Sequence, residues 1–292
     1  MKIFISVFGG LGNQMFQYAY MLSWRASGQR AEICPISFRM KDHNGFELPE
    51  VFSSVRKDVG FSWSRLAFAV YRGFKKVFPK RFHDKVDNVF GVKTIVQSNH
   101  ARYEDKRNDI TQGKRIVFCR GVWQSEKYFI SAVNEVRNAF RFDEKQLSDN
   151  SRSVLKKIRE TNAVSIHVRR GDYLSFGNWS EMCPLDYYKR AIALVSERVE
   201  NPWFFVFSDD KDYVKQYFDM ENCTVVDFNS GKDSWQDMCL MSNCKSNIIA
   251  NSTFSWWGAW LNGNPEKVVV APKCWFPGSQ EDDIVPDGWI RL

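Results

Sequence analysis

The sequence has no uninterrupted apolar run of the roughly 18 to 20 residues that a membrane-spanning helix needs. Its first apolar run, Ile3 to Phe8, meets a Gly-Gly pair instead of a small-residue cleavage site, so we expect no secretory signal peptide. The seven cysteines form no CxxC pair and have no histidine at ligand spacing, which argues against a disulfide framework or a zinc site. These absences predict a cytoplasmic protein with reduced core thiols.

A large excess of one charge is also missing. The 292 residues contain 41 Lys plus Arg against 34 Asp plus Glu, a net charge of +7. No nucleic-acid-binding motif accompanies this modest excess, so no nucleic-acid partner is expected. With 44% hydrophobic residues, the chain is long and apolar enough for two ordinary globular domains.

What the sequence does contain is an alternation of short apolar runs with helical-period stretches, which predicts an α/β fold. The expected strands are residues 3–8, 115–119, 163–168, 203–208, 223–228, 246–250 and 267–271. The expected helices are residues 13–27, 125–140, 184–200, 210–218, 234–244 and 254–262. A polar, loosely patterned segment at 143–152 predicts a boundary near residue 150, and thus domains 1–150 and 151–292.

Residues 61–85 form a basic amphipathic segment. At 100° per residue one side gathers Trp63, Leu66, Val70, Tyr71, Phe74, Val77 and Phe78, and the other gathers Arg65, Arg72, Lys75 and Lys76. The ordinary interpretation is a helix that packs its apolar side on the domain and leaves its basic side in water. The alternative is a helix that lies on an anionic membrane surface.

The first candidate site follows the first strand and reads GGLGNQMFQ, residues 9–17. Glycines at a strand-to-helix turn let the backbone approach a ligand, and the helix N-terminus favours an anionic or polar group. The spacing is neither GxGxxG nor a P-loop. A tight turn that only glycine can make is therefore an equally good interpretation.

The second candidate site, HVRRGDY at residues 167–173, follows the expected strand 163–168. Ligands of open α/β sheets bind outside the carboxyl ends of strands, where His167, Arg169, Arg170 and Asp172 fall. The two arginines can each fork toward phosphate oxygens, with Asp172 orienting one of them. An Arg–Asp surface pair is the alternative.

Two further clusters follow strands. FSDD, residues 207–210, includes Ser208 and ends in two aspartates. Asp209 or Asp210 can cap the following helix, or one of the two carboxylates can bind a base or ribose. A metal site from adjacent aspartates alone is poorly supported. NSTFSWWGAW, residues 251–260, begins a helix whose hydroxyl and N–H groups can either hold a diphosphate or cap the helix. Its three tryptophans are better explained by core packing. Together these clusters predict a nucleoside-diphosphate site in which arginines, without a required metal, neutralise the charge.

These motifs resemble those of the α-1,2-fucosyltransferases of glycosyltransferase family 11, including its bacterial members. The resemblance rests on GGLGNQMFQYA at 9–19, HVRRGDY at 167–173, FSDD at 207–210 and NSTFSWWGAWL at 251–261, with WQSEKYF at 123–129 and FEL at 46–48. It implies a GT-B architecture, two facing Rossmann-like domains with a donor cleft between them. It also implies inverting transfer of L-fucose from GDP-β-L-fucose to the 2-hydroxyl of a galactose in a glycan, in the cytoplasm of a bacterium and in O-antigen synthesis.

The resemblance also implies roles for individual residues. Arg169 and Arg170 would hold the β-phosphate, Asp209 with His167 would contact guanosine, and Gly10 and Asn13 would lie near the fucose. The remaining donor contacts would come from Ser208, Asn251, Ser252, Thr253, Phe254 and Ser255, and from Asp172 in the arginine loop.

Other functions stay open at this point. A fucosyltransferase of different linkage, another GDP-sugar transferase and a non-catalytic nucleotide-sugar or glycan-binding protein all suit the same residues. A lipid-linked glycan is among the candidate acceptors. Such an acceptor would bring the enzyme into peripheral contact with the inner membrane. Asp42, His43, Glu47 and Glu126 are candidate bases, and we assign none of them.

Overall fold

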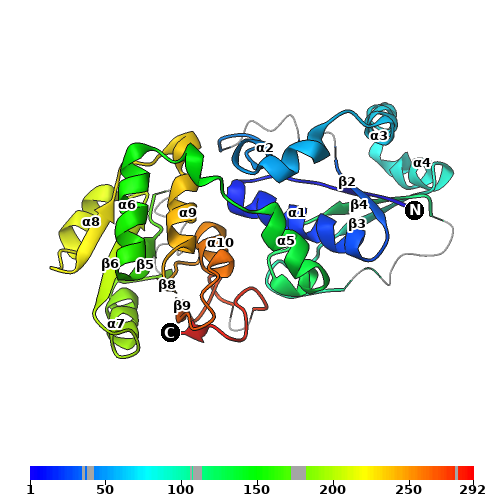
Figure 1. Ribbon diagram of the computed structural model, residues 1–292. Coiled ribbons are helices and arrows are strands. Elements are labelled where there is room, and N and C mark those ends of the chain that lie inside the picture. Colours follow the sequence, from blue (N-terminus) through cyan, green and yellow to red (C-terminus); the bar gives the residue numbers. More distant parts are fainter. Residues whose placement is uncertain (35–36, 38–42, 106, 108–113, 172–181, 280–281) are drawn as a thin grey trace. The chain divides into compact units, whose positions relative to one another are not determined.

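The computed structural model describes residues 1–292 except 35–36, 38–42, 106, 108–113, 172–181 and 280–281. The chain divides into two compact units, Met1–Arg141 and Phe142–Leu292, and each has its own parallel sheet (Figure 1). None of the described helices is both long enough and apolar enough to span a bilayer. All seven cysteines are free thiols, and four of them are buried.

The N-terminal unit is built on a four-stranded parallel sheet of order β2-β1-β4-β3. The strands are β1 (Lys2–Ile5), β2 (Arg30–Ile33), β3 (Val92–Val96) and β4 (Ile116–Arg120). Helix α1 (Leu11–Ala26) connects β1 to β2 and buries 12 of its 16 residues, so it forms the centre of this unit's core. Among the described residues, the other helical elements of this unit are α2 (Leu48–Val51), η2 (Ser53–Val59), α3 (Trp63–Lys75), η3 (Lys80–Phe82), α4 (His83–Val89), η5 (Glu126–Tyr128), η6 (Ile130–Ala132) and α5 (Val133–Ala139).

The amphipathic segment 61–85 is not one helix. Helix α3 ends at Lys75, and Pro79 precedes the short turn η3 that leads into α4. Proline cannot donate a backbone hydrogen bond and disfavours a helical conformation in the residue before it, which explains the break. The stretch expected as a helix at 125–140 is likewise divided into two 3-10 turns and α5.

The ordinary interpretation of α3 was wrong about which face packs on the domain. Phe68 is buried and stacks on Phe4 of β1, with ring centroids 4.1 Å apart, while Trp63, Val70 and Val77 are exposed. Arg65, expected on a solvated face, is buried and donates to the carbonyls of Asp58 and Gly60. The orientation of α3 is therefore determined by its large inward side chains, above all by Phe68, which completes the packing on the sheet.

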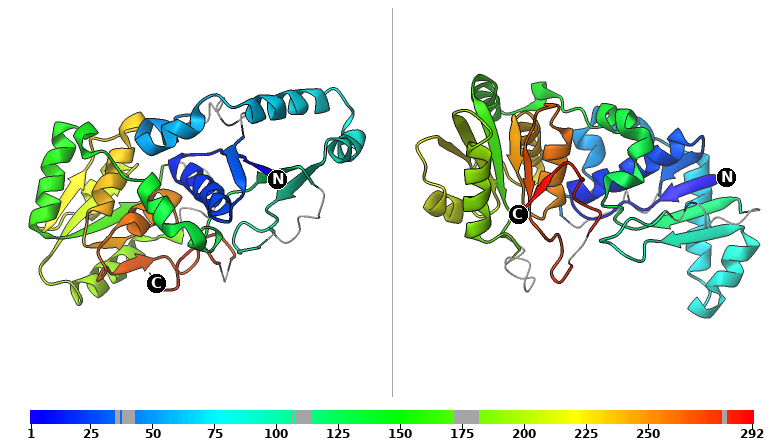
Figure 2. Two further views of the ribbon diagram at one scale, coloured as in Figure 1. Left: turned by 45° about the vertical axis from the view of Figure 1, so that its right-hand side comes forward. Right: turned by 90° about the horizontal axis from the view of Figure 1, so that it is seen from below.

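The C-terminal unit contains a six-stranded parallel sheet of order β10-β9-β8-β5-β6-β7. The strands are β5 (Asn162–Val168), β6 (Pro202–Ser208), β7 (Cys223–Val226), β8 (Ser246–Ile248), β9 (Val269–Ala271) and β10 (Ile290–Arg291). The helical elements are η7 (Glu144–Gln146), α6 (Asp149–Glu160), α7 (Leu185–Ser196), α8 (Lys211–Tyr217), η10 (Gly231–Asp233), α9 (Trp235–Ser242) and α10 (Thr253–Leu261). Helices cover both faces of this sheet (Figure 2).

The strand order reverses direction beside β5. From β5 the chain proceeds through β6 to the edge strand β7, and α9 then returns it to β8 on the other side of β5. Val164, Ile166 and Val168 of β5 face the core formed with α7 and α8, so the alternate residue His167 faces the opposite side, toward α10. The carboxyl ends of β5 and β8 lie at this reversal, which is where open α/β sheets bind ligands.

The polar segment expected as a domain boundary belongs to the C-terminal unit. Phe142 stacks on Trp235, with centroids 6.0 Å apart, and the Ser148 N–H donates to Gln236 Oε1 at 2.8 Å. Ser148 then caps α6, accepting from the Ser151 N–H at 3.2 Å. The division therefore falls at residues 141–142 instead of near 150.

The tryptophans of the fourth motif are core residues, as expected. Trp256 and Trp257 are fully buried, and the Trp256 Nε1–H donates to the carbonyl of Ile284 at 2.8 Å. Helix α10 also approaches α9 closely at Gly258, where an added Cβ would lie 2.9 Å from the Cβ of Met241. Glycine at this position lets the two helices that flank the reversal pack against each other.

We expect Gly258→Ala to lower the free energy of unfolding by about 1 to 3 kcal/mol, because a methyl group must be inserted into a filled helix contact. Chemical denaturation measures this change. Gly263→Ala is the matched control: its Cβ would meet nothing within 4 Å, so it should stay within about 0.5 kcal/mol of wild type. Equal stabilities of the two variants would contradict the proposed close packing.

Candidate functional site

Asp209, which follows β6, organises the loop that follows β5. Its Oδ1 accepts from the backbone N–H groups of Arg170 and Gly171 at 2.9 and 3.0 Å. Its Oδ2 accepts from Arg169 Nη1 at 2.7 Å. An added Cβ at Gly171 would lie 2.8 Å from Oδ2, so a side chain at this position would have to displace the Asp209 carboxylate. A single carboxylate thus fixes both the backbone of the loop and the orientation of Arg169.

Arg170 is oriented by the next residues of the same motif. Its Nε donates to Asp210 Oδ2 at 3.1 Å, and its guanidinium lies 3.8 Å from the centroid of the Tyr213 ring. Asp210 also caps α8, accepting from the Tyr213 N–H at 3.0 Å, and its own N–H donates to Ser208 Oγ at 2.9 Å. Of the two aspartates that the sequence offered as a helix cap, Asp210 is therefore the one that caps α8.

His167 is the last but one residue of β5 and is buried beside Phe254, with ring centroids 5.8 Å apart. Burial, opposed by Asp209 and reinforced by Arg169, lowers the pKa of His167 to about 4. The ring is therefore neutral near pH 7. Its Nδ1 has no hydrogen-bond partner among the described residues, so a buried polar atom is left for a ligand or water to satisfy.

The N-terminus of α10 follows β8. Ser252 caps the helix, accepting from the Phe254 N–H at 3.4 Å, and Thr253 and Phe254 are half-buried. Ser255 is fully buried and its hydroxyl donates to the carbonyls of Ser252 and Ala250 at 3.3 and 3.5 Å, which makes it a structural residue. Asn251 is buried too and donates to the Trp275 carbonyl at 3.4 Å.

The carboxyl edge of the C-terminal sheet thus brings together most of the predicted donor residues. Arg169 and Arg170 follow β5, Ser208 and Asp209 end β6 or follow it, and the cap of α10 follows β8. Asp172 lies outside the described residues. This edge joins guanidinium donors to a helix N-terminus, a combination suited to a phosphate group.

The glycine-rich motif forms a turn in the N-terminal unit. Gly9 has a φ of 78°, a conformation that favours glycine, and Gly10 is the N-cap of α1. Asn13 Oδ1 accepts from Gln124 Nε2 at 2.6 Å, and Gln124 Oε1 has no partner among the described residues. The predicted pair Gly10 and Asn13 therefore lies beside a polar side chain that the sequence analysis did not assign.

Two buried glutamines hold this turn. Gln14 donates to the carbonyls of Gly9 and Gly45 at 2.8 and 2.7 Å. Gln17 accepts from the Phe8 N–H at 2.8 Å and donates to the Gly121 carbonyl at 3.1 Å. The sequence signal that could have identified Gln14 and Gln17 was the position of two amide side chains in the buried part of a helix, where an unsatisfied polar group would be costly.

Two of the base candidates lie near the turn. An added Cβ at Gly10 would lie 3.7 Å from the ring of His43, which has an unusual φ of 53°. Glu47 is buried and accepts from Asn44 at 3.1 Å, while its backbone N–H donates to Gln14. Burial raises the pKa of Glu47. Asp42 lies outside the described residues, and Glu126 lies on η5.

Within the described part of the chain, no group of three or more His, Cys, Asp or Glu side chains is arranged to hold a metal ion.

Burial of the neutral His167 side chain predicts that the stability of the protein depends on pH. Its folded-state pKa of about 4 lies below the ordinary 6.5, so the unfolded chain takes up a proton first as pH falls. Wild-type stability should therefore fall by about 1 to 2 kcal/mol relative to His167→Gln between pH 7 and pH 5. Denaturation of both proteins at several pH values measures the difference. Parallel stability curves would contradict a buried neutral imidazole.

Comparison with known proteins identifies the family. The model of glycosyl transferase family 11 matches residues 2–292. An alpha-1,2-colitosyltransferase of Escherichia coli is 35% identical over 97% of this chain and 96% of its own. The O-antigen biosynthesis glycosyltransferase WbnK of Escherichia coli is 33% identical over 97% of this chain and 98% of its own. A galactoside alpha-(1,2)-fucosyltransferase 1 of Saimiri boliviensis boliviensis is 28% identical over 87% and 64%.

Among solved structures, the alpha-1,6-fucosyltransferase NodZ, crystallised with GDP, matches with a TM-score of 0.50. It is 15% identical and covers 88% of this chain and 91% of its own, so the similarity concerns the fold alone. The two parallel α/β units and this match confirm the predicted GT-B class. The chain therefore belongs to glycosyltransferase family 11 and is a glycosyltransferase.

Proposed function

We propose that the protein is an inverting galactoside α-1,2-fucosyltransferase. It moves L-fucose from GDP-β-L-fucose to the 2-hydroxyl of a galactose in a bacterial glycan, without a metal cofactor. Family membership supports the reaction class, and the bacterial relatives, one of them an O-antigen biosynthesis glycosyltransferase, support a surface-glycan acceptor. We place the enzyme in the cytoplasm, where it acts on galactose-terminated acceptors, lipid-linked ones included.

The observation that carries the proposal is that Asp209 holds Arg169 at the sheet edge where α10 also begins. Arg169 Nη1 is 2.7 Å from Asp209 Oδ2, which leaves the fork of the guanidinium fixed in direction. A cation fixed in this way needs no reorganisation when negative charge develops on a leaving phosphate. The helix N–H groups at Thr253 and Phe254 add a positive dipole end to the same edge.

The reaction is a single displacement. The bond between fucose C1 and the β-phosphate oxygen breaks as the acceptor oxygen bonds to C1 from the opposite face, and the acceptor hydroxyl loses its proton. GDP departs with the electron pair of the broken bond. Because charge on the β-phosphate increases toward the transition state, contacts from Arg169 and Arg170 stabilise that state more than the bound donor. Arginine takes the role that a divalent cation has in other nucleotide-sugar enzymes.

We assign Asp209 a positioning role in place of the guanosine contact that the resemblance implied. Both of its oxygens already accept hydrogen bonds from the loop at residues 169–171. The buried Nδ1 of His167, which has no partner among the described residues, is the better candidate for a direct contact with the donor. Asn13 and Gln124 are proposed as the polar contacts in the N-terminal unit.

A second candidate function is colitosyl transfer. It is favoured by the 35% identity to the alpha-1,2-colitosyltransferase over almost the whole of both chains. Both reactions use the same phosphate contacts and differ in the sugar alone. Donor competition between GDP-fucose and GDP-linked colitose therefore separates them.

The deciding assay incubates the purified protein in EDTA with GDP-fucose, or with GDP-linked colitose, and a panel of β-galactosides that includes lactose. We expect transfer, with the product linkage read by NMR as α-1,2 to galactose. Transfer that occurs only after Mg²⁺ or Mn²⁺ is restored would contradict metal independence. If neither donor is transferred and neither binds in calorimetry, the donor-site assignment is wrong.

Arg169→Lys keeps the charge but loses the fork, so we expect kcat to fall by about 100-fold or more. Arg190→Lys on α7 is the matched control, because Arg190 is exposed and pairs only with the exposed Asp186 among the described residues. Steady-state kinetics with the donor identified above measures both variants. Turnover of Arg169→Lys close to that of Arg190→Lys would remove Arg169 from the catalytic role.

A further inference from the structure

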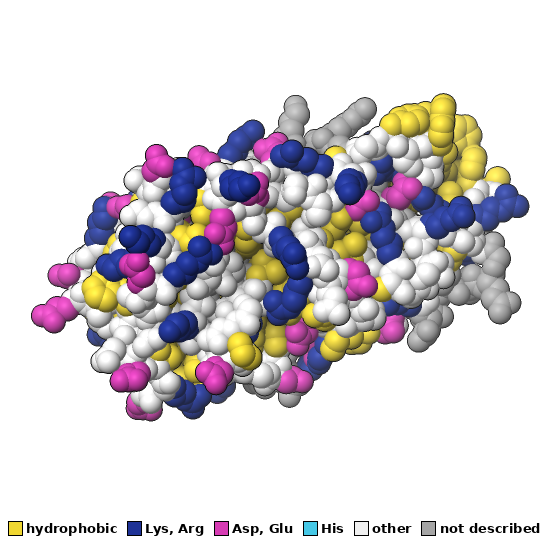
Figure 3. All heavy atoms as spheres, viewed as in Figure 1, with side chains coloured by type: hydrophobic (Ala, Val, Ile, Leu, Met, Phe, Trp, Pro, Cys, Tyr) yellow, Lys and Arg dark blue, Asp and Glu magenta, His cyan; other side chains and the backbone are white. Residues whose placement is uncertain are grey.

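Helix α3 exposes a continuous apolar stripe. Trp63, Leu66, Val70 and Phe74 recur at the three- and four-residue spacing of one face of α3, and Val77 continues this spacing in the turn that follows the helix. These five residues are here called the outer stripe. Their exposed fractions are 77, 46, 64, 47 and 81%. Figure 3 shows hydrophobic side chains gathered at the corner of the molecule that Figure 1 labels α3. Large apolar side chains grouped in this way on a surface mark an interaction site.

Helix α3 is firmly attached to the domain, so loose attachment does not explain why the outer stripe is exposed. Phe68, on the opposite face, stacks on Phe4 with an interplanar angle of 8°. The hydroxyl of the buried Tyr71 donates to Asp87 of α4, and the buried Arg65 donates to two carbonyls of the preceding turn. These contacts hold the helix in one orientation, so the outer stripe is presented by a fixed scaffold.

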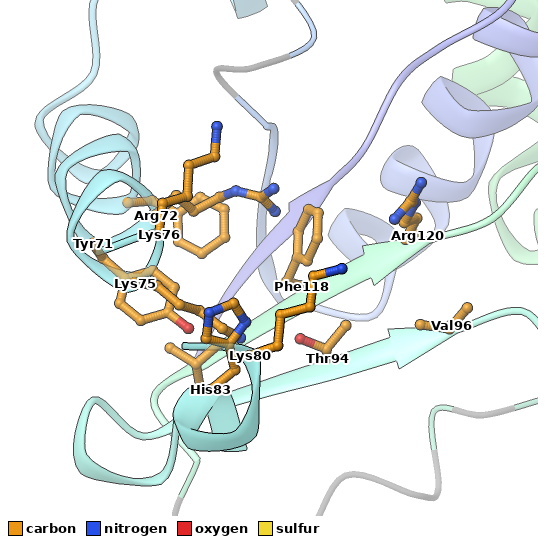
Figure 4. Close-up of a pocket in the computed structure, with 12 residues that line it drawn as sticks. Tyr71, Arg72, Lys75, Lys76, Lys80, His83, Thr94, Val96, Phe118 and Arg120 are labelled. Carbon is orange, nitrogen blue, oxygen red and sulfur yellow. The ribbon is translucent and has the colours of Figure 1, made fainter. Parts of the chain in front are cut away.

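A basic cavity lies on the inner side of α3, the side of Phe68 and Tyr71, between the helix, η3 and the sheet. It has a volume of about 450 Å³, and Figure 4 shows cationic side chains from α3, η3 and β4 around Phe118. The cationic lining residues are Arg72, Lys75, Lys76, Lys80 and Arg120. Lys75 is paired with Asp87 at 2.6 Å, but no carboxylate within the described residues pairs with the other four.

The charge of the surrounding segment is one-sided. Residues 61–85 contain seven Lys or Arg and a single acidic residue, Asp84. Arg81 and Lys85 lie over the ring of Phe82, at 5.0 and 5.8 Å from its centroid. Unpaired cations next to an apolar face are complementary to a surface that offers both hydrocarbon and anions.

Among partners of this chemistry, a bilayer that contains anionic lipid fits best. A second copy of the chain would place the same cations against one another, which opposes a symmetric contact. A nucleic acid would leave Leu66, Val70 and Val77 without bases to stack on, since aliphatic side chains have no π-face. A lipid surface accommodates the aliphatic residues, the aromatic residues at its interface and the cations among its phosphates.

We propose that α3 docks the protein on an anionic membrane surface. The outer stripe enters the boundary between headgroups and acyl chains, and the basic cavity binds the phosphate of a lipid headgroup. Arg72 and Lys80 are its central contacts, because both reach toward Phe118 from different elements (Figure 4). The docking surface lies within the N-terminal unit and does not depend on the identity of the sugar donor.

The test is co-sedimentation of the purified protein with vesicles. One set contains phosphatidylcholine alone, and the other contains phosphatidylcholine with phosphatidylglycerol. We expect retention on the second set at low salt and release at high salt, since screening weakens the contribution of the basic residues. Equal binding to the two sets, or no binding to either, overturns the proposal.

Two pairs of substitutions separate the apolar and the basic contributions. Val70→Asp with Val77→Asp should lower the partition coefficient at least about tenfold, because charge replaces two inserted side chains. Lys76→Glu with Lys80→Glu should lower it about twentyfold. The controls are Ile130→Asp, an exposed apolar residue outside the stripe, and Lys156→Glu with Lys189→Glu, which changes the net charge equally in the C-terminal unit.

Membrane binding that falls equally in test and control variants would show nonspecific attraction and overturn the proposed site. Sedimentation equilibrium tests whether a second copy of the chain covers the stripe instead. If the wild type is a dimer that does not bind vesicles, and Val70→Asp dissociates this dimer, the stripe serves self-association. Adding inorganic phosphate separates a free anion from a lipid headgroup. Release of bound protein by millimolar phosphate at constant ionic strength would mean that the cavity selects the free anion, which contradicts the membrane assignment.

Discussion

The carboxylate of Asp209 makes the interactions on which the carboxyl edge of the C-terminal sheet depends. It comes from the end of β6, yet its hydrogen bonds go to the loop that follows the neighbouring strand β5. Parallel pairing of the two strands makes this reach short, since Val168 of β5 is paired with Ser208 of β6. A strand register in the core therefore determines where a guanidinium at the surface points.

The order of the strands explains why three motifs that are distant in the sequence lie at one edge of the sheet. The order of strands around β5 puts the carboxyl ends of β6 and β8 on either side of it. Short polar sequences that follow these strands must then meet, whatever their distance along the chain. Local caps complete the arrangement, with Asp210 at α8 and Ser252 at α10. These caps and the contacts of Asp209 hold Arg169 and Arg170 in place, whereas Nδ1 of His167 has no partner among the described residues.

The sequence predicted the C-terminal unit better than the N-terminal one. Strands such as 163–168 and 203–208 are long apolar runs and were confirmed, whereas β2 and β3 are short edge strands with charged residues and were missed. Helix α6 was overlooked because its polar face dominates its composition, although Leu155 and Ile158 are buried. The motifs indicated which residues gather at the carboxyl edge of this sheet but not which hydrogen-bond partner each one takes.

Helix α3 shows a further limit of periodicity. A pattern of apolar and basic residues defines two faces but does not say which one packs on the sheet. That outcome depends on Phe4 and Phe118, which lie opposite each other on neighbouring strands and which both contact Phe68. Such tertiary complementarity involves residues 50 and more positions apart and is invisible to a local reading of the sequence.

The buried imidazole of His167 keeps the same charge over a wide range of pH. With a pKa of about 4, this ring stays uncharged throughout the physiological range, although Asp209 lies close enough to raise its pKa. Acidification from neutral pH by a full unit would therefore leave the charge of this residue unchanged. Constancy of electrostatic potential, and not responsiveness to acid, is what a histidine in this position provides.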